Sequence, residues 1–445
     1  MAKLLMAVIV AAAIYVGVSD TFEQDEPVVV IHNSEYWNLK DPLSIQINDQ
    51  SGMLSYRVIL KTQKENFELA QEMLVTPNKE LKLNIKPPKR LFGLKEHDVT
   101  LYIEAGDASQ WNFFKGNRAV VTKKMIIDKK RPQVSVIANS RSITQGGSAL
   151  VIFKASDDNL NSLYLESSNG KKFYPQTYLK DGYYASLVAW PVREKNFRMH
   201  IIAKDLAGNL TKKYVPFYLN NKTYRTSKIT LKDRFLDGKI AELAEEFVET
   251  QGVTDRIKRF KIINEDVRAK NETLIHNITS KVPEEIVERL QITPFYPLKN
   301  GKKVASFGDH RYYYYQNKRV SESYHLGLDL ASVQMGEIKT RNPGKVVFSG
   351  DNGLYGNMPV IHLGMGLYTL YGHCSSVDVN VDEEVSAGMK IANTGMSGYA
   401  MGDHLHFGVL VQGTEVRPEE WMDKQWIRLN IEDIFKSAQK VIDRS

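Results

Sequence analysis

The sequence predicts a mainly β protein of several domains, with one helical segment between two β-rich regions. Its 445 residues are too many for one ordinary hydrophobic core. Short runs that alternate apolar and polar residues fill residues 27–221 and return from residue 292 onwards, as half-buried strands do. Between them, residues 226–290 show the 3.6-residue spacing of helices. A content of 42% hydrophobic and 10% aromatic residues is typical of folded domains.

Residues 1–20 are expected to direct export. Lys3 precedes the apolar run Leu4–Val18, and acidic residues follow from Asp20, an order that places the N-terminus inside and the bulk of the chain outside. The run is short for a membrane span, at about 1.5 Å of rise per residue, and Ala11–Ala13 offers a small-residue cleavage site. The segment is therefore either a cleaved signal peptide or a membrane anchor.

Charge and cysteine content exclude two classes of protein. The formal net charge of +7 is spread thinly, without a dense Lys/Arg block or a nucleic-acid-binding module. We therefore expect no nucleic-acid partner and only weak attraction to an anionic surface or polymer. Cys374 is the one cysteine, so an exported chain has no internal disulfide and the thiol is expected to be buried.

Residues 27–131 and 132–221 are expected to form two tandem immunoglobulin-like β-sandwiches. The segment LYIEAGDASQWN resembles MHIIAKDLAGN about a hundred residues later, close to the length of one sandwich domain. A strand followed by a polar turn with Asp and Asn is similar to the late strands of bacterial immunoglobulin-like modules. Neither region carries a catalytic constellation, so each is interpreted as a spacer or as a surface for a protein partner.

Residues 226–290 are expected to be a helical connector. The stretch DGKIAELAEEFVE places Ile240, Leu243, Ala244, Phe247 and Val248 on one helix face. PEEIVERL, from Pro283, is expected to begin a further short helix, because proline and glutamate favour the first turn. The segment either connects the regions or lies over the site that follows and holds it shut.

Residues 292–430 are expected to form one small, mostly antiparallel β domain, closed by a C-terminal helix at 431–445. Glycine turns separate short strand-like runs, of which the clearest are GKVVFSG, NMPVIHLG, GLYTLYGHC and MKIANTG.

Six of the ten histidines lie between His310 and His406. In HLHFGVLV, a strand-like run, His404 and His406 are two residues apart and project from the same face. In YHLGLDLA, His325 and Asp329 also share a face, but a straight strand would hold them about 13 Å apart. We therefore expect the chain to bend at Gly327, with His325 just before the strand.

Two imidazoles and a carboxylate make a plausible zinc site. His325, Asp329 and one histidine of the later pair give three ligands and leave a fourth position for water, as in catalytic zinc sites. Thiolate sites are excluded by the single cysteine, and magnesium and calcium prefer all-oxygen ligands.

The motifs HLGLDL, YGHCS and HLHFG, in this order, resemble the signature of the lysostaphin/LytM-type zinc metallopeptidases, and the resemblance extends from Pro294 to Pro418. It implies a zinc-dependent metalloendopeptidase that hydrolyses peptide bonds of peptidoglycan stem peptides or cross-bridges. It also implies one Zn²⁺ per chain, with an activated water, in a periplasmic or inner-membrane-anchored protein. Carried over by position, the metal ligands are His325, Asp329 and His406, and the catalytic residues are His373 and His404.

The roles implied for the two catalytic histidines are acid–base roles. His404 would take a proton from the attacking water, and His373 would donate to the oxyanion or relay the proton to the leaving amine. His310 and His362 are interpreted as structural or peripheral. The chain departs from the family at Cys374 and at Gly408, where an acidic residue is usual. It also has a tyrosine-rich loop, YYYYQNKRVSES, that could shape the substrate groove.

Two alternatives remain open from the sequence. The domain could be a catalytically inactive scaffold that activates another cell-wall hydrolase. AGMKIA also resembles the hairpin of biotin- or lipoyl-carrying domains, which would require Lys390 at an exposed turn.

Overall fold

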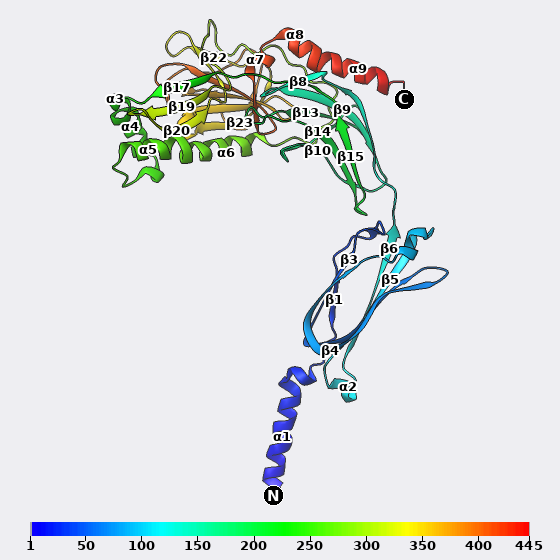
Figure 1. Ribbon diagram of the computed structural model, residues 1–445. Coiled ribbons are helices and arrows are strands. Elements are labelled where there is room, and N and C mark those ends of the chain that lie inside the picture. The colour runs from blue at the N-terminus through cyan, green and yellow to red at the C-terminus, as the bar shows by residue number, and fades with distance from the viewer. Residues whose placement is uncertain (1, 445) are drawn as a thin grey trace. The chain divides into compact units, whose positions relative to one another are not determined.

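The computed structural model describes residues 2–444. Met1 and Ser445, the outer ends of the predicted export segment and C-terminal helix, lie outside the described residues. The chain divides into two compact units (Figure 1). The first contains the chain up to Pro132 together with segments 157–162 and 203–211, and the second contains the remainder.

The first unit begins with helix α1 (Ala2–Val18), whose apolar side chains are largely exposed. Within residues 2–444, none of the helices is both long enough and apolar enough to cross a membrane.

The rest of the first unit is built on one six-stranded sheet. β3 (Leu43–Lys61) pairs with β4 (Asn66–Ile85) along most of its length, and on its other edge first with β1 (Val28–Ile31) and then with β5 (Asp98–Asp107). β6 (Arg118–Ile127) and β2 (Tyr36–Trp37) complete the order β1-β3-β5-β6-β2. Because the long β3 is hydrogen-bonded to β1, β4 and β5, all of these strands belong to one continuous sheet. The predicted tandem immunoglobulin-like sandwiches are therefore not confirmed.

Residues 133–215 form two four-stranded sheets that share one core. β9 (Ser148–Ser156) is buried along most of its length and lies between β7 (Gln133–Asn139) and β13 (Tyr183–Ala189). The sheets have the orders β12-β13-β9-β7 and β11-β10-β14-β15. The remaining strands are β10 (Leu160–Ser167), β11 (Lys172–Phe173), β12 (Gln176–Thr177), β14 (Met199–Asp205) and β15 (Leu210–Val215).

The helical segment packs on the C-terminal domain. β17 (Thr226–Thr230) pairs in parallel with β19 (His310–Tyr315), which pairs with β20 (Lys318–Tyr324). Of the predicted helix face, Ile240, Leu243 and Ala244 are buried and share a core with Phe260, Tyr313 and Leu354. The helix ends at Glu246, so Phe247 is only half-buried and Val248 is 68% exposed. In Figure 1 the green helices lie along the yellow strands of that domain. The helices are α3 (Asp233–Asp237), α4 (Lys239–Glu246), α5 (Arg256–Ile262) and α6 (Arg268–Thr279).

The short helix predicted from Pro283 is wrong. Residues 281–292 contain no helix, because their backbone pairs with the edge of the sheet that contains β12. The amide of Val287 donates to the carbonyl of Thr177 at 2.8 Å, and the amide of Leu179 donates to the carbonyl of Val287 at 3.1 Å. The Gln176 side chain donates to the carbonyl of Pro283 at 2.6 Å. Tertiary pairing outweighs a short segment's weak helical preference.

The C-terminal domain is mainly β, as predicted. Its eight-stranded sheet has the order β18-β21-β29-β25-β24-β23-β27, and β30 pairs with β29. The fully buried β29 (Leu405–Val411) lies at its centre. The other strands are β18 (Lys302–Ala305), β21 (Leu328–Ala331), β23 (Gly344–Asp351), β24 (Asn357–His362), β25 (Leu367–Gly372), β27 (Glu384–Val385) and β30 (Thr414–Val416). A second sheet contains β22 (Glu337–Lys339), β28 (Lys390–Asn393) and β26 (Ser376–Val377).

The predicted C-terminal helix is present as α9 (Asp433–Ile442). It packs on β7 and β9 of the sheets formed by residues 133–215. Phe435 lies against Tyr178 with ring centroids 5.4 Å apart. The sheets of residues 133–215 and the C-terminal domain thus share one continuous hydrophobic core.

Candidate metal centre and catalytic cleft

Three adjacent strands at the centre of the large sheet position the site. β21 and β29 run antiparallel with Asp329 opposite His406, and on the other side of β29 Gly372 of β25 is opposite His406. His373 follows directly after Gly372. Residues about eighty positions apart in the sequence therefore meet because of strand register.

His325 reaches the site through a bend between β20 and β21. Its Nε2 lies 3.0 Å from Oδ1 of Asp329, much closer than a straight strand would allow, as the sequence predicts. A side chain at Gly327 would clash with the His406 ring, so glycine is required here by close approach.

The three predicted ligand atoms form a tight triangle. Nε2 of His325 lies 3.1 Å from Nδ1 of His406, which lies 2.9 Å from Oδ1 of Asp329. A tetrahedral zinc ion with bonds of about 2.0–2.1 Å holds its ligand atoms roughly 3.3 Å apart. The spacing therefore matches a group that could hold one metal ion.

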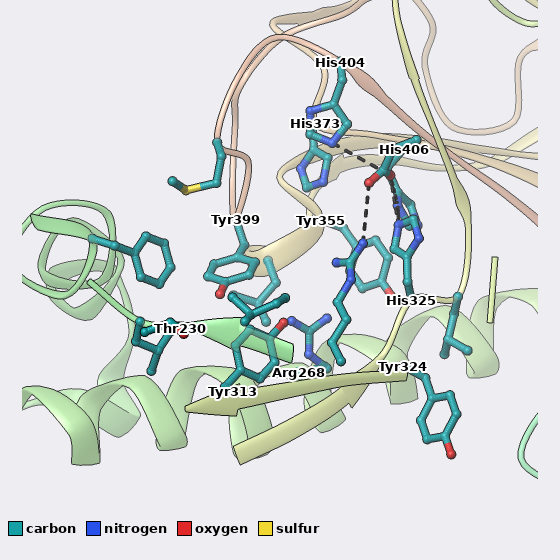
Figure 2. Close-up of a pocket in the computed structure, with 18 of the residues that line it drawn as sticks. Thr230, Arg268, Tyr313, Tyr324, His325, Tyr355, His373, Tyr399, His404 and His406 are labelled. Carbon is teal, nitrogen blue, oxygen red and sulfur yellow. Dashed lines mark hydrogen bonds and ion pairs between the residues drawn. The ribbon is translucent and has the colours of Figure 1, made fainter. Parts of the chain in front are cut away.

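The two other predicted histidines face the same point (Figure 2). Nε2 of His404 lies 3.8 Å from Oδ1 of Asp329. The rings of His373 and His404 are 4.8 Å apart, and those of His373 and His406 are 5.8 Å apart. His373 has a φ of 65°, a left-handed conformation that is uncommon for a residue with a side chain and recurs at functional sites.

Backbone carbonyls fix the tautomers of three histidines. Nδ1 of His325, His373 and His404 lies 2.9, 2.9 and 2.7 Å from the carbonyls of Ser306, Ser397 and Gly402. A carbonyl can only accept, so each Nδ1 carries the proton and each neutral ring directs its Nε2 lone pair into the site. Lone pairs that converge on one point without a donor between them fit a cation.

The electrostatics of the site favour neutral imidazoles at His406 and His373 beside an ionised Asp329. Burial alone would raise the pKa of Asp329, but His325 and His406 hold it well below its ordinary range. Burial lowers the pKa of His406 to about 4 and that of His373 to about 3. These are the protonation states that metal binding requires.

The ligand group lies in a cavity of about 380 Å³ that contains residues the sequence did not reveal. The helical segment contributes one wall, with residues 229–232, Phe235 and Arg268. The tyrosine-rich segment is a strand and not the predicted loop, because Tyr312–Tyr315 lie in β19, but its Tyr313 lines the cavity. The run of four tyrosines was the only feature of the sequence that indicated a cavity wall from β19. The other cavity residues missed from the sequence are Arg311, Leu354, Tyr355, Tyr399 and Met401.

The remaining residues singled out from the sequence lie outside the ligand group. His310 stacks on Tyr324 with ring centroids 4.1 Å apart. Burial lowers the pKa of His362 to about 4, and His362 stacks on Tyr368. Both fit structural roles.

Two further residues bear on the alternatives. The thiol of Cys374 is buried, as predicted, and burial raises its pKa to about 12. Lys390 lies in β28, paired with Lys339 and with its ammonium 2.9 Å from Asp378. It is not at an exposed turn, so the structure speaks against a carrier domain.

Comparisons with known proteins match the part of the chain that contains the ligand group. Residues 323–418 match the model of peptidase family M23. The DD-carboxypeptidase/endopeptidase Mpg of Neisseria meningitidis is 33% identical over 94 residues, 21% of this chain and 22% of Mpg. The peptidoglycan DD-endopeptidase ShyA of Vibrio cholerae is 32% identical over 121 residues, 27% of this chain and 28% of ShyA.

The murein hydrolase activator NlpD of Escherichia coli K12 is also similar, 30% identical over 127 residues, which are 28% of this chain and 30% of NlpD. The chain thus spans less than a third of the length of each of these relatives. The matched region of this chain contains β21, β25 and β29, and therefore the whole histidine and aspartate group. Residues 323–418 form a peptidase family M23 domain in the C-terminal part of the chain.

Proposed function

We propose that the protein is a zinc-dependent endopeptidase that hydrolyses peptide bonds in peptidoglycan. The observation that carries the proposal is the convergence of five side chains on one point: His325, Asp329 and His406 as ligands, with His373 and His404 beside them. An inactive scaffold would not require backbone carbonyls that fix the tautomers of three histidines, nor three ligand atoms that converge without a hydrogen-bond donor among them. The relative ShyA, named as a peptidoglycan DD-endopeptidase, supports peptidoglycan as the substrate, and Mpg, named as a DD-carboxypeptidase/endopeptidase, supports a peptidase.

The roles of the two flanking histidines follow from their hydrogen bonds. A bound zinc ion would supply Lewis-acid chemistry, polarising a water and the scissile carbonyl. His404 has a lone pair on Nε2, 3.8 Å from Asp329, and can take a proton from a water placed there. His373 donates its Nδ1 proton to Ser397, so its Nε2 is also an acceptor. This favours His373 as the relay that passes a proton to the leaving amine.

A second function, activation of another cell-wall hydrolase, is favoured by the similarity to NlpD. An activator of this kind would need neither the metal nor His404. The β regions before residue 221 would then recognise the partner. In the endopeptidase they would be spacers. The strand order of residues 133–215 supports an immunoglobulin-type module for the second of them.

We further propose that the chain is exported to the periplasm, where its substrate would lie. The apolar run of α1 between Lys3 and Asp20 supports this. If that segment is not cleaved, it would keep the protein at the inner membrane.

The test combines metal content with turnover. Purified full-length protein should contain about one zinc per chain and should release cleaved peptides from cross-linked peptidoglycan. His404→Ala should keep the zinc and lose activity by about 10²–10⁴-fold, whereas His200→Gln, a histidine on the distant strand β14, should change neither. Zinc-free wild-type protein that still stimulates a separate hydrolase would instead establish the activator.

A further inference from the structure

The cavity that holds the ligand group has a cationic wall on the side of the helical segment. Lys232, Arg268 and Arg311 line it, and Asp329 is the only carboxylate among the described residues that do so. Asp329 faces the histidines. Apart from the metal ligands, the charge in this cavity is therefore positive, and a bound divalent ion would add to it.

Two hydrogen bonds hold the Arg268 guanidinium in place, and among residues 2–444 it forms no direct ion pair with a carboxylate. Arg268 begins α6, and its Nε and Nη2 donate to the carbonyl and to the side-chain oxygen of Asn264, at 3.2 and 3.0 Å. Asn264 is 1% exposed, and its amide donates to the Ser321 hydroxyl at 2.8 Å. Across residues 2–444, no carboxylate lies within 4.0 Å of the Arg268 guanidinium. Glu272, one turn further along α6, lies 3.8 Å from Arg193. Burial raises the pKa of Glu272 overall, although the charges of Arg268 and Arg193 both act to lower it.

Aromatic groups shape the space around this guanidinium. It lies 5.8 Å from the ring centroid of Tyr399, and Figure 2 shows it beside Tyr313 within the cavity. Apolar side chains, among them Ile229, Leu231 and Leu354, complete the walls. A charge in such low-dielectric surroundings attracts a counter-ion more strongly than a charge on an open surface.

Arg311 lines the same cavity close to the metal ligands. Its Nη2 is 4.0 Å from Oδ2 of Asp329, and its Nε is 3.5 Å from Asp309. Both contacts are long for charge-assisted hydrogen bonds, so Arg311 keeps donors for a substrate close to the reacting centre.

We propose that Arg268, together with Arg311, forms a carboxylate-binding subsite that selects peptides with a free carboxylate beside the scissile bond. The inference rests on the proposed peptidase function and adds a substrate class to it. A planar guanidinium with free N–H groups binds a carboxylate in two-pronged geometry. The helical segment then contributes to substrate recognition, beyond connecting the domains.

The experiment uses two cross-linked peptides that differ at one group: the carboxylate next to the scissile bond is free in one and amidated in the other. Full-length wild-type protein should have a kcat/KM at least about tenfold higher for the free acid. Arg268→Gln should remove that preference mainly by raising KM for the free acid, and Arg268→Lys should retain part of it. Lys270→Gln, an exposed cation on the same helix, should keep the preference.

A binding measurement separates this inference from the proposed activity. Fluorescent versions of the two peptides are titrated into metal-depleted protein and followed by anisotropy. Tighter binding of the free acid that is lost in Arg268→Gln supports the subsite, even if neither peptide is cleaved and the peptidase proposal fails. Equal binding and equal cleavage of both peptides by the wild type would overturn the subsite.

Discussion

Within residues 2–444, three groups of side chains lie close enough together to share an ion, and they differ in the hydrogen bonds that their ligand atoms already accept. One is the buried group His325, Asp329 and His406 in the C-terminal domain. The other two are acidic, and both lie in the first unit. They consist of Glu23, Asp49 and Asp107, and of Asp128, Asp157 and Asp205.

In the acidic groups, neighbouring N–H groups satisfy Asp107 and Asp205, although Oε2 of Glu23 is buried without a hydrogen-bond partner among the described residues. Oδ1 of Asp107 accepts from the amides of Ser109 and Asn117, and its Oδ2 accepts from the Asn117 side chain. Asp205 accepts in the same way from the amide and side chain of Asn209. The carboxylates therefore organise their own turns.

The pKa shifts separate the groups too. Burial and the nearby Asp49 raise the pKa of Glu23 to about 7, whereas the two histidines keep that of Asp329 well below its ordinary range. Proximity of potential ligands is thus weak evidence for a metal. Converging lone pairs with no donor among them are stronger evidence.

The largest expected effect distinguishes the groups directly. His406→Ala should abolish zinc binding and lower peptidase activity by more than about a thousandfold, because a ligand and the metal chemistry are lost together. Elemental analysis and turnover measure the two effects. Asp205→Asn is the matched control and should keep full zinc content. Loss of zinc in the control, with retention in His406→Ala, would reverse our assignment.

Asp107→Ala tests the structural interpretation of the acidic groups. Three hydrogen bonds to a buried carboxylate are lost, so the free energy of unfolding should fall by about 3 kcal/mol, with zinc content and turnover unchanged. Urea denaturation, followed by fluorescence and by proteolysis within residues 20–132, gives the stability. An unchanged denaturation midpoint would contradict this role.

Gly327→Ala sharpens the geometric requirement. Because a methyl group there would clash with the His406 ring, zinc affinity should drop by about ten- to a hundredfold. Competition with a chromogenic chelator measures the affinity. Gly402→Ala, where a side chain would meet open space, is the control. Equal affinities in the two variants would show that the bend tolerates a side chain.

The smallest effect concerns a buried carboxylate outside all three groups. Oε2 of Glu420 accepts from the amide of Ser148 at 3.0 Å, and burial raises its pKa to about 7. The folded state keeps this proton between about pH 4.5 and 7 while the unfolded chain releases it. Stability should therefore fall by on the order of 2 kcal/mol as the pH rises from 5 to 8.

Glu420→Gln should show a flatter stability profile over this pH range, measured as thermal melting at each pH. A slope equal to that of the wild type would mean that another group carries the dependence.

The ligand group could be predicted from the sequence because its spacing is local. His404 and His406 are two residues apart and therefore share a face in any strand. Gly327, which permits the bend, lies between His325 and Asp329 in the sequence. Arg268 could not be predicted, since it reaches the cavity from a helix more than fifty residues before His325, and only tertiary packing places it there.

The wrong helix prediction and the unconfirmed sandwich prediction have a similar cause. The segment from Pro283 has helical residues, but strand β12 offers its backbone better partners. In the first unit, alternation correctly predicts strands. It does not reveal that the 19 residues of β3 join what would otherwise be two layers.

The parallel pairing of β17 with β19 limits how the peptidase can be isolated. A fragment that begins near Leu290 would lose the partner of β19 and leave Tyr313 and Leu354 without the apolar helices that cover them. Such a fragment would present an unpaired, aromatic strand edge and would be prone to self-association. The shortest version suitable for expression should therefore begin no later than Thr226.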